Sequence, residues 1–326
     1  MTPENKISWF CTYTPLEILD AAGWHPVRHF GDPDLLESAD EMLHPAICPY
    51  ARACLSQELR QEGPHHAFFV NSCDAMRRLY DVWKEEFQQD FVYLMDLPRN
   101  EGVWGRKLLA EEFRHLIGVL EDHSGVKITA QLIQAAGMAR EEARLAYLES
   151  AKGLKGRARL EAAMRFQGGT EQPEPSSRKG RPVVLTGNLL NPTGIITSLE
   201  QAGAMVVWMD LCNGDRSFAS STYVEGDDLA RLLDAMAARY LEKHPCARMQ
   251  DKGRHYQLLV DRVRSEGAQG VIYASLKFCD SYLYDFPLLE ERLKQEGIPL
   301  LRLESDYGDG HVGQLLTRVE AFIEMI

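Results

Sequence analysis

Short apolar runs alternate with longer amphipathic stretches along the whole chain. An apolar run of strand length followed by a helical pattern is typical of the βαβ units of a parallel sheet. The pattern therefore predicts a parallel α/β protein. The predicted strands are 7–13, 24–30, 66–71, 91–95, 183–186, 205–209, 271–276 and 300–303.

Helices are predicted where apolar residues return on one face at the helical period. In 74–86, for example, Met76, Leu79 and Trp83 recur at this spacing. Pro15 is suited to open a helix and Gly23 to end it. The predicted helices are 15–22, 37–59, 74–86, 105–122, 129–152, 196–202, 227–243, 255–266, 287–296 and 313–326.

One polar stretch divides the chain into two halves of similar pattern. Residues 167–181, QGGTEQPEPSSRKGR, are rich in Pro, Gly and Ser and lack periodicity, which predicts a linker or an exposed loop. We expect two doubly wound, Rossmann-like or flavodoxin-like parallel-sheet domains with additional helices and an active-site cleft between them. The first, 1–166, carries a helical insert, and the second is 182–326.

Charge and hydropathy exclude several classes of protein. The net charge of −12 argues against a nucleic-acid partner, which would need a basic face. No apolar run approaches the roughly 20 residues of a membrane span, and the N-terminus lacks the basic and apolar parts of a signal peptide. We expect a cytoplasmic protein without a membrane partner. Its seven cysteines should therefore be reduced and available for metal binding or catalysis.

Three cysteines lie close to the ends of apolar runs. Cys279 comes after 271–276, Cys11 follows the mostly apolar run 7–10, and Cys73 follows the apolar run 67–70. Ligands of open α/β sheets bind outside the carboxyl ends of the strands. The chain has no CxxC pair, no GxGxxG after the first strand and no GxxxxGK[ST] loop. The interpretation that remains is a shared metal or redox centre of dispersed cysteines that the fold brings together.

The local sequences around six cysteines resemble one protein family. Together with the C-terminal GIPLLRLESDY they are similar, in order, to the motifs of the 2-hydroxyacyl-CoA dehydratase D-component family, which includes cluster-bearing subunits of benzoyl-CoA reductase. The motifs are CTYTPLEILDAAGWHPVR at Cys11, LHPAICPYARA at Cys48, NSCDAMRRLYDVW at Cys73, MDLCNGDR at Cys212, HPCARM at Cys246 and GVIYASLKFCDSYLYDFPLLEERL at Cys279.

The resemblance implies an iron–sulfur enzyme, either a lyase or a related low-potential reductase. A 4Fe–4S cluster would be held by Cys11, Cys48 and Cys279, which leaves one iron open for water or the substrate thioester. It also implies two partners, an ATP-dependent iron–sulfur activator and a sister subunit or second copy of the chain. The activator would supply one low-potential electron, with which the thioester carbonyl of an acyl-CoA becomes a ketyl radical.

Two alternatives remain open at this stage. Cys11 stands close to the start of the chain, whereas a substantial segment precedes the first cluster cysteine of the well-known subunits. Some family members carry a double-cubane 8Fe–9S cluster and reduce small molecules as homodimers, and Cys73, Cys212 and Cys246 would complete six thiolates for it. The second alternative is a non-catalytic assembly subunit that only holds a cluster.

Other residues have a structural interpretation beside a functional one. Cys54 is expected to be buried packing on a helix. Arg52, Lys277 and Arg216 could offset the negative charge of a cluster or of a thioester anion, although single basic residues more often form salt bridges. Glu17 is the one candidate for a catalytic proton-transfer group, and its alternative is an acidic residue in the first turn of a helix.

Overall fold

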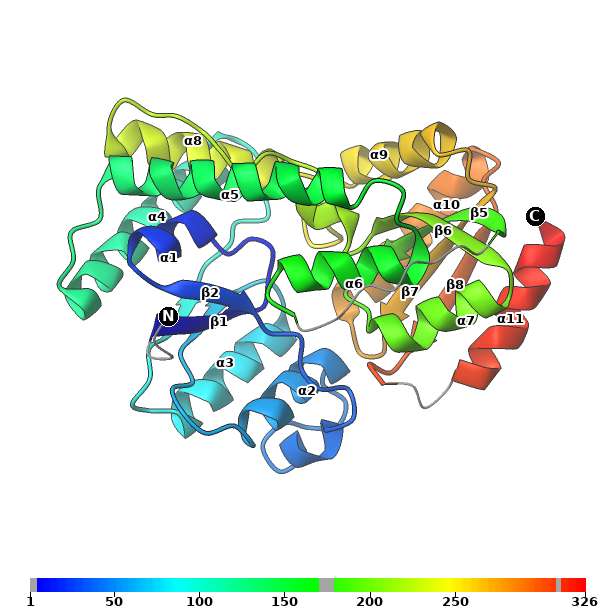
Figure 1. Cartoon of the computed structure of the whole chain (residues 1–326), viewed down its shortest axis with the longest axis horizontal. Coiled ribbons are helices and arrows are strands. Elements are labelled where there is room, and N and C mark those ends of the chain that lie inside the picture. Colours follow the sequence, from blue (N-terminus) through cyan, green and yellow to red (C-terminus); the bar gives the residue numbers. More distant parts are fainter. Residues whose placement is uncertain (1–4, 170–178, 309–311) are drawn as a thin grey trace. The chain divides into compact units, whose positions relative to one another are not determined.

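The computed structural model describes residues 5–169, 179–308 and 312–326 (Figure 1). Their contacts define two compact units, each built from three segments of the chain. The segments of unit 1 are the described residues up to His29, Arg60–Ser150 and Phe218–Asp251. Those of unit 2 are the described residues of Phe30–Leu59, Ala151–Ser217 and Lys252–Ile326.

Unit 1 contains a four-stranded, all-parallel sheet in the order β2-β1-β3-β4. The chain starts at β1, moves to one side for β2 and then to the other side for β3 and β4. This reversal makes β1 and β3 the flanks of a topological switch point. The strands are β1 Lys6–Trp9, β2 His25–Arg28, β3 Ala67–Val70 and β4 Val92–Met95.

Helices pack against this sheet through apolar faces. Ile7 and Phe68 of the sheet share one buried core with Phe113 of α4 and Leu233 of α8. Helix α4 lies along α8, and α1 contacts α5 (Figure 1). The helices of unit 1 are α1 Leu16–Ala21, α3 Asp74–Glu86, α4 Val103–Ser124, α5 Ala130–Ser150 and α8 Leu229–Glu242.

Unit 2 repeats the same winding in the order β6-β5-β7-β8, again all parallel. Strands β5 and β7 flank its switch point, and every residue of β7 is buried, as expected for a strand covered on both faces. The strands are β5 Arg181–Gly187, β6 Ala204–Asp210, β7 Gly270–Leu276 and β8 Leu300–Ser305.

The remaining helices belong to unit 2, apart from the last residue of η4. They are η2 Leu36–Ala39, α2 Pro49–Glu58, α6 Gly156–Phe166, η3 Pro192–Ile196, α7 Thr197–Gln201, η4 Asp215–Phe218, α9 Lys252–Ser265, α10 Asp280–Gln295 and α11 Val312–Met325. Two four-stranded parallel sheets with helices confirm the predicted α/β class. The grouping into units is discontinuous, whereas the domains expected from the sequence, 1–166 and 182–326, are contiguous. Most of the expected linker, residues 170–178, lies outside the described residues.

The stretch 37–59, which was expected to be mostly helical, is not helical in its centre. A short 3₁₀ turn, η2, precedes an irregular stretch, and α2 begins only at Pro49. Pro45 and Pro49 explain this, because each proline lacks an N–H and disfavours helical geometry in the residue before it. Proline is tolerated in the first helical turn, so Pro49 can open α2.

The predicted start of the helix at Pro287 was also wrong, because α10 begins at Asp280 and contains Pro287. A proline inside a helix removes one backbone hydrogen bond. Here the loss is outweighed by a buried stripe at helical spacing, which includes Tyr282, Phe286 and Leu289. Strand β1 ends at Trp9 rather than Tyr13, and α6 was not predicted.

Candidate functional site

Two cysteines stand at the switch point of unit 1. Cys11 lies two residues beyond β1, and Cys73 follows β3 and is the N-cap residue of α3. Strands β1 and β3 are hydrogen-bonded neighbours, with Trp9 opposite Phe68. Both thiols are therefore carried by the edge of the sheet at which doubly wound proteins bind ligands.

Cys279 occupies the corresponding position in unit 2. The chain leaves β7 through Phe278, a non-glycine residue with a φ of 58°, and Cys279 then caps α10. The carbonyl oxygen of Cys279 accepts hydrogen bonds from the backbone N–H groups of Tyr282 and Leu283, both at 3.0 Å. A left-handed conformation at a residue with a side chain is uncommon and strained, and such residues cluster at functional sites.

Cys48 lies at the same edge of the unit 2 sheet, although no strand directly precedes it. It is the N-cap residue of α2, and two residues later the ring of Tyr50 contacts Tyr307, with the ring centroids 5.6 Å apart. Tyr307 lies just past β8, which pairs with β7, and the N–H of Lys277 donates to the carbonyl oxygen of Ser305. These contacts put the start of α2 and the start of α10 at the carboxyl edge of one sheet.

The three cysteines of the expected ligand set are buried to the same degree. Cys11, Cys48 and Cys279 are each 8% exposed, whereas Cys54, farther along α2, is fully buried. All seven cysteines lie in the described residues and no disulfide links them. Helix N-termini such as those behind Cys48 and Cys279 favour thiolates, and thiolates are the ligands that iron–sulfur clusters require. The donor chemistry of these residues fits such a cluster.

The second-tier cysteines fall into two groups. Cys73 and Cys212 are partly exposed, and Cys212 follows β6 with its N–H bonded to the carbonyl oxygen of Asn188, beyond β5. Cys246 instead belongs to the buried apolar core of unit 1, which also includes Cys11. The position of Cys54, fully buried on α2, is the one expected for packing.

Each of the three basic candidates faces a carboxylate. The Arg52 guanidinium pairs with Asp40, and Lys277 Nζ lies 3.0 Å from Asp306 Oδ2. Arg216 is buried, with its Nε 2.6 Å from Asp210 Oδ1. The structure therefore gives each of these side chains a structural ion pair.

Arg216 also links the carboxyl edge of the sheet to the helix that follows Cys279. One guanidinium nitrogen donates to the Tyr282 hydroxyl at 2.6 Å, and another donates to the Gly187 carbonyl oxygen at 3.0 Å. Burial opposes the charge of Arg216, but the Asp210 carboxylate outweighs it and raises the pKa of the guanidinium well above its ordinary value. Arg216 therefore remains charged while buried, and it contacts the first turn of α10 through Tyr282.

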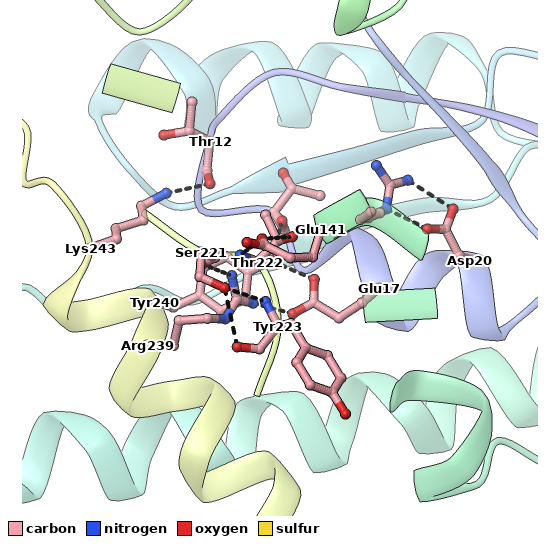
Figure 2. Close-up of polar contacts among 12 residues, drawn as sticks. Thr12, Glu17, Asp20, Glu141, Ser221, Thr222, Tyr223, Arg239, Tyr240 and Lys243 are labelled. Atoms are coloured by element: carbon pink, nitrogen blue, oxygen red, sulfur yellow. Dashed lines mark hydrogen bonds and ion pairs between the residues drawn. The ribbon is translucent and has the colours of Figure 1, made fainter. Parts of the chain in front are cut away.

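Glu17 is buried, at 4% exposure, on helix α1 (Figure 2). Its carboxylate pairs with the Arg239 guanidinium and lies 2.8 Å from the Tyr240 hydroxyl, which is also 2.9 Å from the carbonyl oxygen of Thr14. Burial and the neighbouring Glu17 raise the pKa of Tyr240 far above its usual range. The phenol therefore stays protonated, and its hydroxyl acts as a hydrogen-bond donor.

Many unrelated proteins share this architecture, so the family of the chain is identified by comparison with known families. A family model described as 2-hydroxyglutaryl-CoA dehydratase, D-component, matches residues 11–326. The chain belongs to the 2-hydroxyglutaryl-CoA dehydratase D-component family. The match begins at Cys11 and includes all seven cysteines.

Relatives of this D-component chain are named as enzyme subunits. The beta subunit of (R)-phenyllactyl-CoA dehydratase of Clostridium sporogenes is 23% identical over 351 residues, which cover 100% of the chain and 92% of the relative. A benzoyl-CoA reductase subunit of Thauera aromatica is 26% identical over 363 residues, covering 99% and 92%. The beta subunit of lactoyl-CoA dehydratase of Anaerotignum propionicum is 25% identical over 359 residues, covering 100% and 92%.

These names confirm the expected family and an enzyme of the dehydratase or reductase type. Because each relative is named as a subunit, a partner subunit is implied. In the described part of the chain, no helix combines the length and apolarity that crossing a membrane requires.

Sequence reasoning missed the polar side chains that surround the cysteines. At Asp210, two residues before Cys212, they are Thr186 and His255, which lie 2.7 Å and 3.2 Å from the Asp210 carboxylate. An acidic residue at the end of a buried strand, in the run MDLCNGDR, was an available signal for this group. Around Cys11 they are residues of α8, more than 200 positions away, for which the sequence offered no signal.

Proposed function

We propose that this D-component chain is the iron–sulfur subunit of an ATP-dependent radical enzyme of the 2-hydroxyacyl-CoA dehydratase and benzoyl-CoA reductase type. Its substrate would be an acyl-CoA thioester, its electron donor an ATP-dependent iron–sulfur activator, and its partner a sister subunit or a second copy. The observation that supports this most directly is the equal burial of Cys11, Cys48 and Cys279 at the carboxyl edges of two parallel sheets.

In this proposal the three thiolates hold a 4Fe–4S cluster. When bound, the cluster supplies one-electron transfer and one iron without a protein ligand, at which a thioester oxygen can be polarised. The N-termini of α2 and α10 stabilise the thiolates of Cys48 and Cys279. Phe278 makes the turn that puts Cys279 at its helix N-terminus, and the Arg216 cation supports the same helix through Tyr282.

The residues around Cys11 exclude water and fix the backbone. Phe10 stacks on Phe69 with the ring centroids 4.4 Å apart, and the Tyr13 ring is buried beside the cysteine. An apolar shell of this kind limits solvent access to an iron–sulfur site and tunes its potential. Glu17 contributes to the same rigidity, since both its oxygens already accept contacts from α8. We therefore assign it to support of the loop rather than to proton transfer.

The test is a series of single Cys→Ala variants purified and reconstituted without oxygen. Cys11→Ala, Cys48→Ala and Cys279→Ala should each lose most of the iron per chain. Cys54→Ala is the matched control, since Cys54 lies on the same helix as Cys48 but is fully buried, and it should keep the wild-type iron content. Full iron in Cys279→Ala would contradict the ligand assignment.

The double-cubane reductase remains a second candidate because Cys73 and Cys212 also follow strands and are partly exposed. It predicts that Cys73→Ala and Cys212→Ala lose iron as severely as the first three variants. A turnover assay distinguishes an acyl-CoA enzyme from a non-catalytic assembly subunit. With an activator and ATP, the enzyme converts a 2-hydroxyacyl-CoA or an aromatic acyl-CoA, whereas an assembly subunit would bind iron and convert neither.

A further inference from the structure

Residues at the carboxyl end of α8 contact the loop that carries Cys11. The ammonium of Lys243 donates to the carbonyl oxygen of Thr12, the residue directly after Cys11 (Figure 2). The same ammonium lies over the ring of Tyr13, 3.8 Å from the ring centroid. One side chain thus contacts the two residues that follow the cysteine.

Two more residues of α8 contact the continuation of this loop. Tyr240 reaches the Thr14 carbonyl oxygen and Glu17, and Arg239 reaches Glu17 (Figure 2). Lys243 follows Arg239 by four positions and Tyr240 by three, a spacing that brings side chains to the same side of a helix, and all three side chains contact residues between Thr12 and Glu17. All these contacts lie within unit 1.

The local structure suits a lysine at this position. Lys243 is the C-cap residue of α8, and its N–H bonds to the carbonyl oxygen of Arg239 at 3.0 Å. A cation is stabilised at the carboxyl end of a helix, where the helix dipole is negative. The face of the Tyr13 ring adds a cation–π attraction.

We propose that Lys243 is a positioning residue for Cys11, which fixes the backbone beside the cysteine and supplies a positive charge to its thiolate. This inference rests on the proposed function, because it takes Cys11 as a cluster ligand. The Thr12 carbonyl belongs to the residue next to the ligand, so loss of its hydrogen bond frees the ligand's own loop. Loss of the cation also removes a favourable charge from the reduced, more negative state of the cluster.

The test compares three variants in two measurements. Lys243→Met keeps the length of the side chain but removes the charge, and Lys243→Arg keeps the charge. Arg231→Met is the matched control, because it removes one cation from the other end of α8, where Arg231 is 70% exposed and pairs with Asp227. The first measurement is the rate at which iodoacetamide alkylates Cys11 in the metal-free protein, read by mass spectrometry with Cys279 as internal reference. The second is the midpoint potential of the reconstituted protein.

In the Lys243→Met variant, Cys11 should be alkylated faster, on the order of tenfold, because the loop loses the charge-assisted hydrogen bond that holds it. Loss of the cation acts in the opposite direction by lowering the thiolate fraction, so the rates are compared at about pH 9.5, where thiols of ordinary pKa are ionised. Cys279 should react at the wild-type rate, since it lies in unit 2. The midpoint potential should become more negative in Lys243→Met, stay near wild type in Arg231→Met and recover most of the difference in Lys243→Arg.

Equal Cys11 alkylation and equal potential in wild type and Lys243→Met would overturn the inference. Alkylation that rises equally at Cys11 and Cys279 would also overturn it, because it would report a general loss of stability. Failure of the proposed function gives a different result. The wild-type protein would then bind no iron, while the alkylation rates would still report whether Lys243 holds the loop.

Discussion

Replacing Glu17 by glutamine tests whether this carboxylate is structural or catalytic. The substitution keeps the size and hydrogen-bonding capacity of the side chain but removes its charge. Arg239 would then be left without the carboxylate that faces it. That guanidinium side chain is only 12% exposed, and the Glu17 carboxylate raises its pKa despite the opposing effect of burial.

The expected cost follows from the burial of this ion pair. Removing one partner of a buried pair typically destabilises a protein by about 3–5 kcal/mol, because the other charge remains buried without compensation. Arg239 keeps some contact with solvent and lies 3.5 Å from the Ser221 carbonyl oxygen, so we place the loss near the lower limit, at about 3 kcal/mol. A domain is typically stable by about 5–15 kcal/mol, so this loss is easily measured.

The assay is urea denaturation followed by tryptophan fluorescence. Four of the five tryptophans, Trp9, Trp24, Trp83 and Trp104, belong to unit 1, so the signal reports on the unit that contains Glu17. The control is the double variant Glu17→Gln/Arg239→Met, which removes both charges. It should recover most of the lost stability, since no unpaired charge remains.

A loss below about 1 kcal/mol in Glu17→Gln would refute this reasoning, because that value is usual for exposed ion pairs. Unchanged stability together with abolished turnover would instead support the proton-transfer role. A double variant as unstable as the single one would show that the cost does not come from the unpaired Arg239.

Two further predictions concern the stability of each unit. Hydrogen bonds from Arg144, and further ones from Thr222, lower the pKa of Glu141 to about 2, against the opposing effect of burial. This lowered pKa stabilises the fold above about pH 4.5, and the contribution is lost as the pH falls toward 2. Glu141→Gln should therefore flatten the pH dependence of the urea midpoint in that window, and an unchanged slope would contradict it. In unit 2, Gly187 has a φ of 154°, and a Cβ there would lie 1.8 Å from the Ala274 carbonyl oxygen. Gly187→Ala should cost more than about 2 kcal/mol, whereas Gly297→Ala, with a φ of 68° and open space, should cost about 1 kcal/mol in the same circular-dichroism melt; equal losses would exclude the steric explanation.

The sequence predicted regular elements best where one apolar face decides the structure. Helix α3 has the predicted bounds, 74–86, because Met76, Leu79 and Trp83 form an uninterrupted buried stripe. Prediction failed where tertiary contacts override local signals. The buried stripe of α10 continues through Pro287, and the two prolines near Cys48 interrupt the helix expected there.

The cysteines of the candidate site could be anticipated because all three stand in family motifs, and Cys11 and Cys279 also follow apolar strands. Their polar support could not, since Lys243 and Thr12 are far apart in the sequence and the contact depends on how α8 packs in unit 1. The roles of Arg216 and Glu17 depend in the same way on partners that only the fold supplies. Local sequence can thus indicate the ligands of a site but not the residues that hold the ligands in place.

Iron and acid-labile sulfide per chain, measured on protein purified without oxygen, test the central claim most directly. The account predicts about four of each, the content of a single cubane. About eight iron and about nine sulfide would support the double-cubane reductase instead. Near zero of both under strict exclusion of oxygen, in protein that circular dichroism shows to be folded, would contradict the assignment of this chain as an iron–sulfur subunit.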